Sequence, residues 1–287
     1  MAKKILVTGA NGQLGQAIKE IAIKYPKLEF VFVSRSKLDI TNQTEVINYF
    51  KDNNFDAVVN CAAYTAVDLA ETDVENARLV NATAVKYLAE ATNQANIPFV
   101  HISTDYVFDG TIATPRLESD EVNPIGIYGQ TKLEGEEFAL AINPKTIVIR
   151  TAWVYSKYGK NFVKTMLWLF NEKEEIGVIN DQIGSPTNAV DLADAIAQIV
   201  AKDELVYGIF NYSNEGECSW FDFASEIKAL TGAKIKINPI PTTAYPTPAK
   251  RPAYSLLDKT KIKTTYHISI PNWEDSLKNE LNFLVAK

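Results

Sequence analysis

The sequence has few residues of the types that bind metals or form disulfides. Its 287 residues include two cysteines and two histidines. Two cysteines make neither a disulfide framework nor a zinc site, and two histidines disfavour a His-based triad or metal cluster. Cys61 lies in an apolar run and is predicted to be a small core residue. We therefore expect no metal site, and the cysteine usage favours a cytoplasmic location.

Long hydrophobic runs and an excess of positive charge are also absent. No window approaches a membrane span, and the N-terminus enters a strand without an apolar stretch of signal length. The 29 Lys and Arg residues are outnumbered by 35 Asp and Glu, which gives a net charge of −6 without a basic stripe. This disfavours a role on DNA or RNA. We expect no membrane or nucleic-acid partner, although a few local cations could still bind an anionic substrate.

Short apolar strands alternate with helices in the first half of the chain. The expected strands are 5–8, 30–33, 57–62, 99–103 and 146–150, and the expected helices are 12–24, one capped by Thr41, 71–96 and 128–141. Nearly wholly apolar strands separated by helices predict a parallel sheet covered on both faces. The fold class is therefore α/β, a Rossmann-type doubly wound parallel sheet.

The second half is less regular. Helices are expected at 161–170, 191–200, 219–230 and after Pro271, with extended segments at 176–179 and 208–212 and a proline-rich loop between 239 and 252. The composition shift predicts a dinucleotide-binding domain over residues 1–150. Residues 151–287 would form a smaller, mainly substrate-binding part, packed on the first and partly interleaved with it.

A glycine-rich turn, GANGQLG at residues 9–15, joins the first expected strand to the first helix. Gly9 permits the tight turn, Gly12 lets the backbone approach a pyrophosphate, and Gly15 lets the helix pack closely on the sheet. The free N–H groups and the positive helix end would face the phosphates. The predicted cofactor contacts here are Gly9, Asn11, Gly12, Gln13, Leu14 and Gly15. The GxxGxxG spacing resembles the extended branch of the short-chain dehydrogenase/reductase superfamily.

The residues after the second strand indicate which nicotinamide cofactor is used. Ser34 and Arg35 follow Val33, and an arginine here can accept the 2′-phosphate of NADP. Arg35 therefore favours NADPH, with a solvated arginine at a strand end as the alternative. Asp39 lies slightly further on and could keep NADH usable.

Tyr128 and Lys132 form a YxxxK pair, spaced to share one face of a helix. The pair follows the fourth expected strand, as the superfamily arrangement requires. Reduction of a ketone needs a hydride on carbon and a proton on oxygen. A free tyrosine has a pKa near 10, and an adjacent ammonium should bring it closer to neutrality. Tyr128 would then donate the proton, while Lys132 tunes it and holds the nicotinamide ribose.

A third group should hydrogen-bond the substrate carbonyl. Superfamily members place Ser or Thr just past the fourth strand, where this chain has Ser103 and Thr104. Thr104 is predicted to polarise the carbonyl, and Ser103 to face the cofactor. His101, inside the strand, is interpreted as a core or supporting residue.

Longer segments resemble the dTDP-4-dehydrorhamnose reductase family. They are VVNCAAYTAVDLAE at 58–71, STDYVFDG at 103–110, YGQTKLEGE at 128–136, RTAWVY at 150–155, NFVKTM at 161–166, INDQIGSPT at 179–187 and AYPTPAKRPAYSLLD at 244–258. They cover nearly the whole chain. The resemblance implies hydride transfer from NAD(P)H to C4 of dTDP-4-dehydro-L-rhamnose, a nucleotide sugar, which gives dTDP-L-rhamnose.

The resemblance also implies roles for individual residues. Thr104, Tyr128 and Lys132 would be catalytic, and Asp105, Tyr106 and Trp153 would hold the sugar. The cofactor would be lined by Asp39, Ile40, Ala62, Ala63, Tyr64 and Thr65. Arg251 is our own candidate for a diphosphate ligand, with an exposed charge beside prolines as the alternative. Trp153 could equally serve sheet packing.

Two departures from the family pattern concern Tyr64 and the first helix. Family members commonly have His where Tyr64 stands, and some dimerise around Mg²⁺ through acidic side chains where this chain has Gln16 and Ala17. We therefore predict no Mg²⁺ site, and a homodimer through other surfaces stays open.

Two other functions remain. One is another extended-branch nucleotide-sugar enzyme, such as a 4-epimerase or a dehydratase, although Tyr106 stands where a dehydratase would want Glu. The other is a non-catalytic NADP-binding regulatory subunit like that of some methionine adenosyltransferases.

Overall fold

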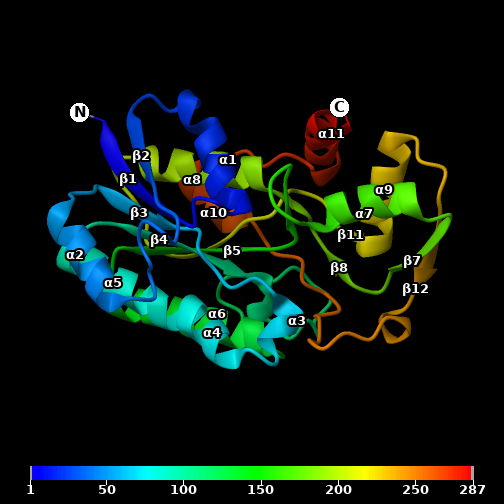
Figure 1. Ribbon diagram of the computed structural model, residues 1–287, viewed down its shortest axis with the longest axis horizontal. Coiled ribbons are helices and arrows are strands. Elements are labelled where there is room, and N and C mark those ends of the chain that lie inside the picture. Colours follow the sequence, from blue (N-terminus) through cyan, green and yellow to red (C-terminus); the bar gives the residue numbers. More distant parts are fainter. Residues whose placement is uncertain (1, 286–287) are drawn as a thin grey trace.

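The computed structural model describes residues 2–285, and its centre is a six-stranded sheet in the order β10-β5-β4-β3-β1-β2 (Figure 1). The strands are β1 Lys3–Thr8, β2 Leu28–Phe32, β3 Ala57–Asn60, β4 Phe99–Thr104, β5 Thr146–Thr151 and β10 Gly208–Asn211. All of their pairings are parallel. The predicted Rossmann-type α/β fold is confirmed.

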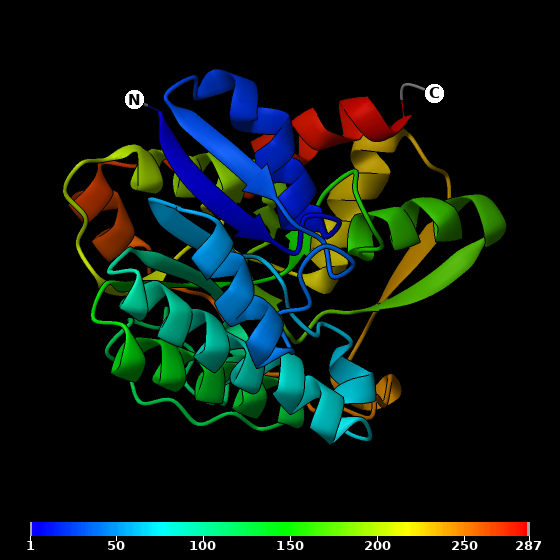
Figure 2. The same ribbon diagram turned by 60° about the vertical axis from the view of Figure 1, so that its left-hand side comes forward.

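Helices cover both faces of this sheet (Figure 2). One layer contains α1 Gln13–Ile21 and α8 Ala189–Ala201, and the other contains α2 Gln43–Asp52, α5 Ala84–Gln94 and α6 Ile127–Ile142. Successive strand residues enter opposite layers, as the two-residue period of a strand requires. Ile5 and Val7 belong to the α1/α8 core, whereas Leu6 belongs to the core beneath α5.

Two details of the first half differ from the expectation. The helix expected over 71–96 is divided into α4 Val74–Arg78, the π-helical turn η2 Leu79–Thr83 and α5, and a separate short helix, α3 Val67–Ala70, precedes it. The predicted Thr41 cap of α2 is also wrong, because the side chain of Asn42 accepts from the N–H groups of Thr44 and Glu45. The Thr41 hydroxyl instead donates to Asp39.

The second half forms its own apolar cluster and also contributes to the main sheet. The cluster is built from α7 Phe162–Glu172, β7 Glu175–Ile179, α9 Trp220–Thr231, β12 Lys236–Ile240 and α11 Trp273–Val285. The short strands β6 Val154–Tyr155 and β9 Thr187–Asn188 pair with each other, as do β8 Ile183–Gly184 and β11 Cys218–Ser219. In contrast, β10, α8 and α10 Thr260–Tyr266 pack with the main sheet. The domain boundary at residue 150 stays a prediction.

Strand β12 was not expected, because it contains Pro239. It pairs only with β7, in a two-stranded sheet. Both strands of this small sheet therefore have one unpaired edge, where a proline is tolerated. Short 3₁₀ turns complete the fold at η1 Ala22–Lys24, η3 Asp105–Val107 and η4 Thr242–Ala244. Within residues 2–285, no helix combines the length and apolarity needed to cross a bilayer.

Candidate active site

The glycine-rich turn has the close backbone contacts that its sequence predicts. Gly9 has φ +66°, and a Cβ there would lie 2.6 Å from the nitrogen of Ala62. A Cβ on Gly15 would lie 2.4 Å from the carbonyl oxygen of Gly9. Gly12 precedes α1 and provides no side-chain cap. The first N–H groups of α1 are thus left for an anion, which fits a bound pyrophosphate.

A groove of about 420 Å³ opens beside this turn. Ten of the predicted cofactor residues line it: Gly9, Asn11, Gly12, Ser34, Arg35, Asp39, Ile40, Ala62, Ala63 and Tyr64. The predicted contacts Gln13, Leu14, Gly15, Thr65 and Ser103 are not part of this lining, and neither are Tyr128 and Lys132, which were predicted to contact the cofactor as well. The groove and the glycine cradle fit a dinucleotide, with room beside the backbone where a side chain would clash.

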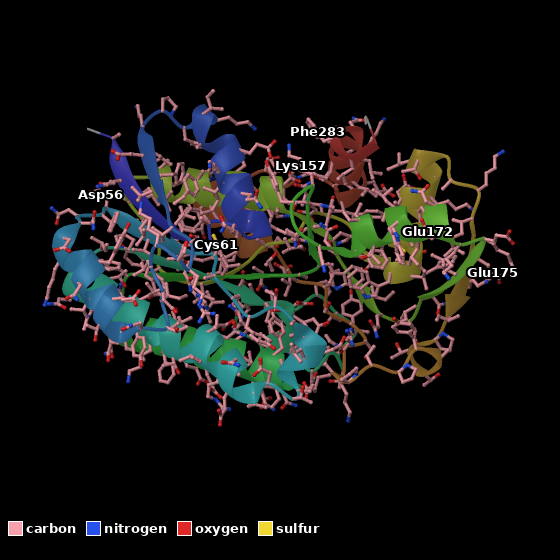
Figure 3. The ribbon with its side chains drawn as sticks, in the orientation of Figure 1. Asp56, Cys61, Lys157, Glu172, Glu175 and Phe283 are labelled. Carbon is pink, nitrogen blue, oxygen red and sulfur yellow. The ribbon has the colours of Figure 1, made fainter. Side chains whose placement is uncertain are left out.

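Six lining residues were not predicted: Thr8, Val33, Leu38, Thr41, Cys61 and Val80. The sequence does carry a signal for Thr8, Val33 and Cys61, because each stands at or just past the end of a parallel strand, where ligands of such sheets bind. Cys61, labelled in Figure 3, is half-buried: it packs against the α1/α8 core and also lines the groove, so its prediction as a buried core residue is only partly met. Burial raises the pKa of its thiol.

Arg35 lies at this groove with 77% of its side chain exposed. Its Nε is 3.2 Å from Oδ2 of Asp39, whose Oδ1 accepts from the N–H and hydroxyl of Thr41. Burial opposes ionisation of Asp39, but the bonds from Thr41 and Arg35 hold its pKa below the usual value. The groove therefore presents a cation and an anion side by side, compatible with either a 2′-phosphate or a 2′-hydroxyl.

Tyr128 lies on the first turn of α6, and Thr104 is the last residue of β4. The Tyr106 ring meets that of Tyr128 edge-on, with centroids 5.5 Å apart. Burial raises the pKa of Tyr128 to about 12, a hydrogen bond with Thr104 opposes this, and Asp105 adds to it. The expected lowering of the phenol pKa by Lys132 is therefore wrong, because burial dominates. A phenol that stays protonated at neutral pH is suited to donate a proton.

Lys132 is almost completely buried one helical turn beyond Tyr128. Its Nζ donates to the carbonyl of Ile102 at 2.6 Å and lies 3.4 Å from Nε2 of His101. Burial lowers the pKa of Lys132 to about 8, while the carboxylate of Glu136 opposes the shift. The amine can thus exchange a proton near neutral pH.

Two buried polar atoms at the end of β4 have no hydrogen-bond partner among the described residues. They are the hydroxyl oxygen of Ser103 and Oδ2 of Asp105. Burial raises the pKa of Asp105 to about 6, against hydrogen bonds from Ser255 and Thr104. Native proteins rarely leave such atoms unpaired, so these two are suited to receive polar groups of a ligand.

Trp153 and Arg251, the two predicted site residues in the second half of the chain, have other partners in the structure. Trp153 has φ +49° and stacks on Trp220 with ring centroids 3.5 Å apart. The terminal nitrogens of Arg251 bind Asp68, with an Nη2–Oδ2 distance of 2.8 Å, and also Thr247 and the carbonyl of Ala249. Arg251 is therefore an ion-paired side chain rather than an exposed charge, and its role as a phosphate ligand stays a prediction.

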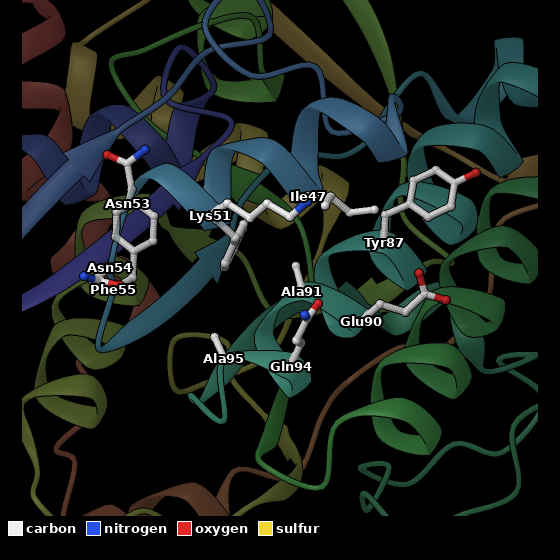
Figure 4. Close-up of a pocket in the computed structure, with 11 residues that line it drawn as sticks. Ile47, Lys51, Asn53, Asn54, Phe55, Tyr87, Glu90, Ala91, Gln94 and Ala95 are labelled. Atoms are coloured by element: carbon white, nitrogen blue, oxygen red, sulfur yellow. The ribbon is translucent and has the colours of Figure 1, made fainter.

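A second cavity, of about 380 Å³, lies between α2 and α5 (Figure 4). Its lining includes Phe55 and Ala95, which precede β3 and β4 in the chain. It is therefore at the amino ends of the strands, opposite the glycine turn and Tyr128. None of the predicted site residues lines it.

Comparisons with known proteins agree with this geometry. The family model described as RmlD substrate binding domain matches residues 3–285. A dTDP-4-dehydrorhamnose reductase from Aggregatibacter actinomycetemcomitans is 42% identical over 290 residues, covering 96% of this chain and 97% of that protein. The crystal structure of a dTDP-4-dehydrorhamnose reductase from Clostridium acetobutylicum superposes with a TM-score of 0.94 at 44% identity, covering 98% of this chain and 99% of the other.

A second solved structure is that of the dTDP-4-dehydrorhamnose reductase of Bacillus anthracis in complex with NADP. It superposes with a TM-score of 0.94 at 37% identity, and the match covers 98% of this chain and 99% of that one. Both the sequence relatives and the solved structures match along almost the entire chain. The chain therefore belongs to the dTDP-4-dehydrorhamnose reductase family.

Proposed function

We propose that this chain reduces the C4 keto group of dTDP-4-dehydro-L-rhamnose to dTDP-L-rhamnose with NADPH. The observation that carries the proposal is the meeting of Tyr128, Thr104 and Lys132 at the carboxyl ends of the strands, beside a groove that fits a dinucleotide. The relatives that match over the full chain length bear the name of this activity. One of them was crystallised with NADP.

Three residues of the chain would take part in the reduction. A bound NADPH supplies the hydride. The Thr104 hydroxyl, which donates to Oδ1 of Asp105 at 3.0 Å in the structure, would turn to the substrate carbonyl and polarise it. Tyr128, protonated at neutral pH, gives its proton to the carbonyl oxygen as negative charge develops there. Lys132 lies one turn along the same helix, where it would hold the nicotinamide ribose.

The buried, unpartnered polar atoms of Ser103 and Asp105 support binding of a ligand near this centre. The sugar would lie against Asp105, Tyr106 and Trp153, and Arg251 would approach the diphosphate. The rest of the cofactor would follow the groove to Arg35, which accepts a 2′-phosphate, while Asp39 would leave NADH usable. These individual roles are proposals.

The decisive experiment mixes purified protein with NADPH and dTDP-4-dehydro-L-rhamnose and follows cofactor absorbance and product together. We expect one NADPH to be oxidised for each dTDP-L-rhamnose formed. Conversion of a nucleotide sugar without net NADPH oxidation would instead identify an epimerase or a dehydratase. NADPH binding without turnover, together with copurification of a synthetase, would identify a regulatory subunit.

We further propose a cytoplasmic location, supported by the two free cysteines Cys61 and Cys218. Association as a homodimer stays a prediction. Its test is the mass of the purified protein in solution, measured with and without Mg²⁺.

A further inference from the structure

A row of buried polar side chains crosses the neighbouring strands β1, β3 and β4 and reaches Lys132. The Thr8 hydroxyl donates to Oδ1 of Asn60 at 2.6 Å, and Nδ2 of Asn60 lies 3.1 Å from Nδ1 of His101. Nε2 of His101 then faces Nζ of Lys132 at 3.4 Å. All four side chains are almost inaccessible to solvent. The proposed function gives no role to Asn60 or His101.

The backbone fixes the orientation of the Asn60 amide. The N–H of Ala62 donates to Oδ1 of Asn60 at 3.2 Å. A backbone N–H can only donate, so the carbonyl side of the amide must point toward Ala62. The NH₂ side consequently points at Nδ1 of His101. Since an amide nitrogen also only donates, Nδ1 must be the acceptor and carries no proton.

The proton of His101 is then on Nε2, facing Lys132. Burial, and secondly the charge of Lys132, lower the pKa of His101 well below its usual value, so the imidazole is neutral. A neutral imidazole carries one N–H, and with Nδ1 accepting, that group is Nε2–H. A neutral lysine amine has a lone pair to accept this hydrogen, and an ammonium has none. The carbonyl of Ile102 accepts from Lys132 in either charge state.

We propose that His101 is a positioning residue for Lys132. Asn60 holds His101 in the Nε2–H form, and this N–H orients the Lys132 amine and favours its neutral state. The kinetic consequence of this inference rests on the proposed function, whereas the tautomer itself does not.

The other charged groups around Lys132 act in known directions. Burial lowers the pKa of Lys132 to about 8, and Glu136, four residues further along α6, raises it. The Glu136 carboxylate is bound by Arg150 on β5, with an Nη2–Oε2 distance of 2.7 Å, so part of its charge is compensated. His101 is the titratable side chain that faces Lys132 from β4.

The first test reads the tautomer directly by ¹⁵N NMR of protein labelled at histidine nitrogens. The chain has two histidines, so His267→Gln leaves the signals of His101 alone. We expect a protonated Nε2 and an unprotonated Nδ1, unchanged from about pH 5 to about pH 9. A protonated Nδ1, or titration of His101 within that range, would overturn the proposal whether or not the protein is active.

The second test reverses the tautomer with Asn60→Asp. A carboxylate only accepts hydrogen bonds, so His101 must donate from Nδ1 to the new carboxylate in this variant. Its Nε2 then carries a lone pair that faces Lys132. This lone pair accepts from an ammonium and so favours the charged form of Lys132. We expect the NMR pattern to invert and the alkaline limb of the kcat–pH profile to move up by about one pH unit or more. Asn96→Asp, on the surface, serves as the control and should leave both unchanged.

A double variant separates the imidazole from the direct effect of the new carboxylate. In Asn60→Asp/His101→Phe the carboxylate is present but the imidazole is absent. The upward shift of the alkaline limb must therefore be smaller than in Asn60→Asp. An equal shift, or an inverted tautomer with an unmoved alkaline limb, would overturn the positioning role. Should Asn60→Asp fail to fold, the wild-type NMR pattern still decides the assignment. Absence of any turnover in the wild type would instead contradict the proposed function.

Discussion

The guanidinium of Arg150 grips the carboxylate of Glu136 in the interior between β5 and α6. Three N–O distances of 2.7, 3.0 and 3.1 Å join the two groups, and the side chains are 2% and 1% exposed. The Arg150 guanidinium also lies 5.1 Å from the centre of the Phe108 ring. This ion pair fixes α6, the helix that carries Tyr128 and Lys132, to the central sheet.

Removal of one partner of this ion pair should destabilise the folded protein. We expect Arg150→Met to lower the free energy of unfolding by about 3–5 kcal/mol, because it leaves the Glu136 carboxylate buried without its cation. The double variant Arg150→Met/Glu136→Leu should recover much of the loss. Urea unfolding measures all three proteins, and a single-variant loss below about 1 kcal/mol would contradict a structural role for the pair.

Tyr128→Phe should abolish most turnover while NADPH still binds. The change removes one hydroxyl, the proton source, and we expect kcat to fall by about 10²-fold or more. Steady-state rates and fluorescence titration with NADPH measure the two effects separately. Tyr207→Phe, an exposed position before β10, is the matched control. A rate equal to that of the wild type would remove Tyr128 from the catalytic set.

Arg35→Ala should weaken NADPH more than NADH. Its guanidinium lies at the groove, and its loss removes a ligand of the 2′-phosphate that NADH lacks. We expect about a tenfold rise in Kd for NADPH, equivalent to about 1.4 kcal/mol. Titrations with both cofactors measure it, with the exposed neighbour Lys37→Ala as the control. Equal weakening of the two cofactors would argue against the phosphate contact.

Gly9→Ala should cost more than the same change at Gly232, although both glycines have positive φ values of +66° and +69°. At Gly232 nothing lies within 4 Å of an added Cβ, so the cost is the backbone strain of about 1–2 kcal/mol. At Gly9 the Cβ also strikes Ala62, which lines the groove. Thermal unfolding and NADPH titration should show a larger loss in both quantities at Gly9, and similar losses would mean that the turn relaxes freely.

Asp105 should make stability depend on pH. Its pKa is raised from 3.8 to about 6 by burial, so the folded state binds more protons than the unfolded state between these values. Stability contributed by protonated Asp105 is therefore present below about pH 4 and is lost as the pH rises to about 6, by up to about 3 kcal/mol. Asp105→Asn should remove this dependence. Urea unfolding of both proteins across pH 4–7 tests it, and parallel curves would contradict the shift.

The sequence was sufficient for the parts of the fold that depend on local pattern. Apolar runs such as 146–150 predicted the strands, and the glycine spacing after Thr8 predicted a turn that needs room beside Ala62. The place of β10 in the main sheet was out of reach, because a short strand gives no signal of which neighbour it pairs with. The π-helical turn at 79–83 was also missed, since an Ala-rich helical pattern does not change there.

In the candidate site, too, some features could be predicted from the sequence and others could not. Motif and position brought together Thr104, Tyr128 and Lys132, whereas the pKa of Tyr128 was predicted in the wrong direction because it depends on burial. The ion pair of Arg251 with Asp68 joins residues 183 positions apart, and neither residue indicates the other. His101 was interpreted as a core or supporting residue, and nothing in the sequence indicated its contact with Asn60.

The bond between Asp68 and Arg251 has a mechanical consequence. Asp68 belongs to α3, which directly follows the segment 62–64 at the rim of the cofactor groove. Arg251 belongs to the proline-rich loop between residues 239 and 252. The ion pair therefore joins α3 to this loop, together with the hydrogen bond from the N–H of Ala249 to Asp68, and any movement of the loop away from α3 must separate a cation from an anion.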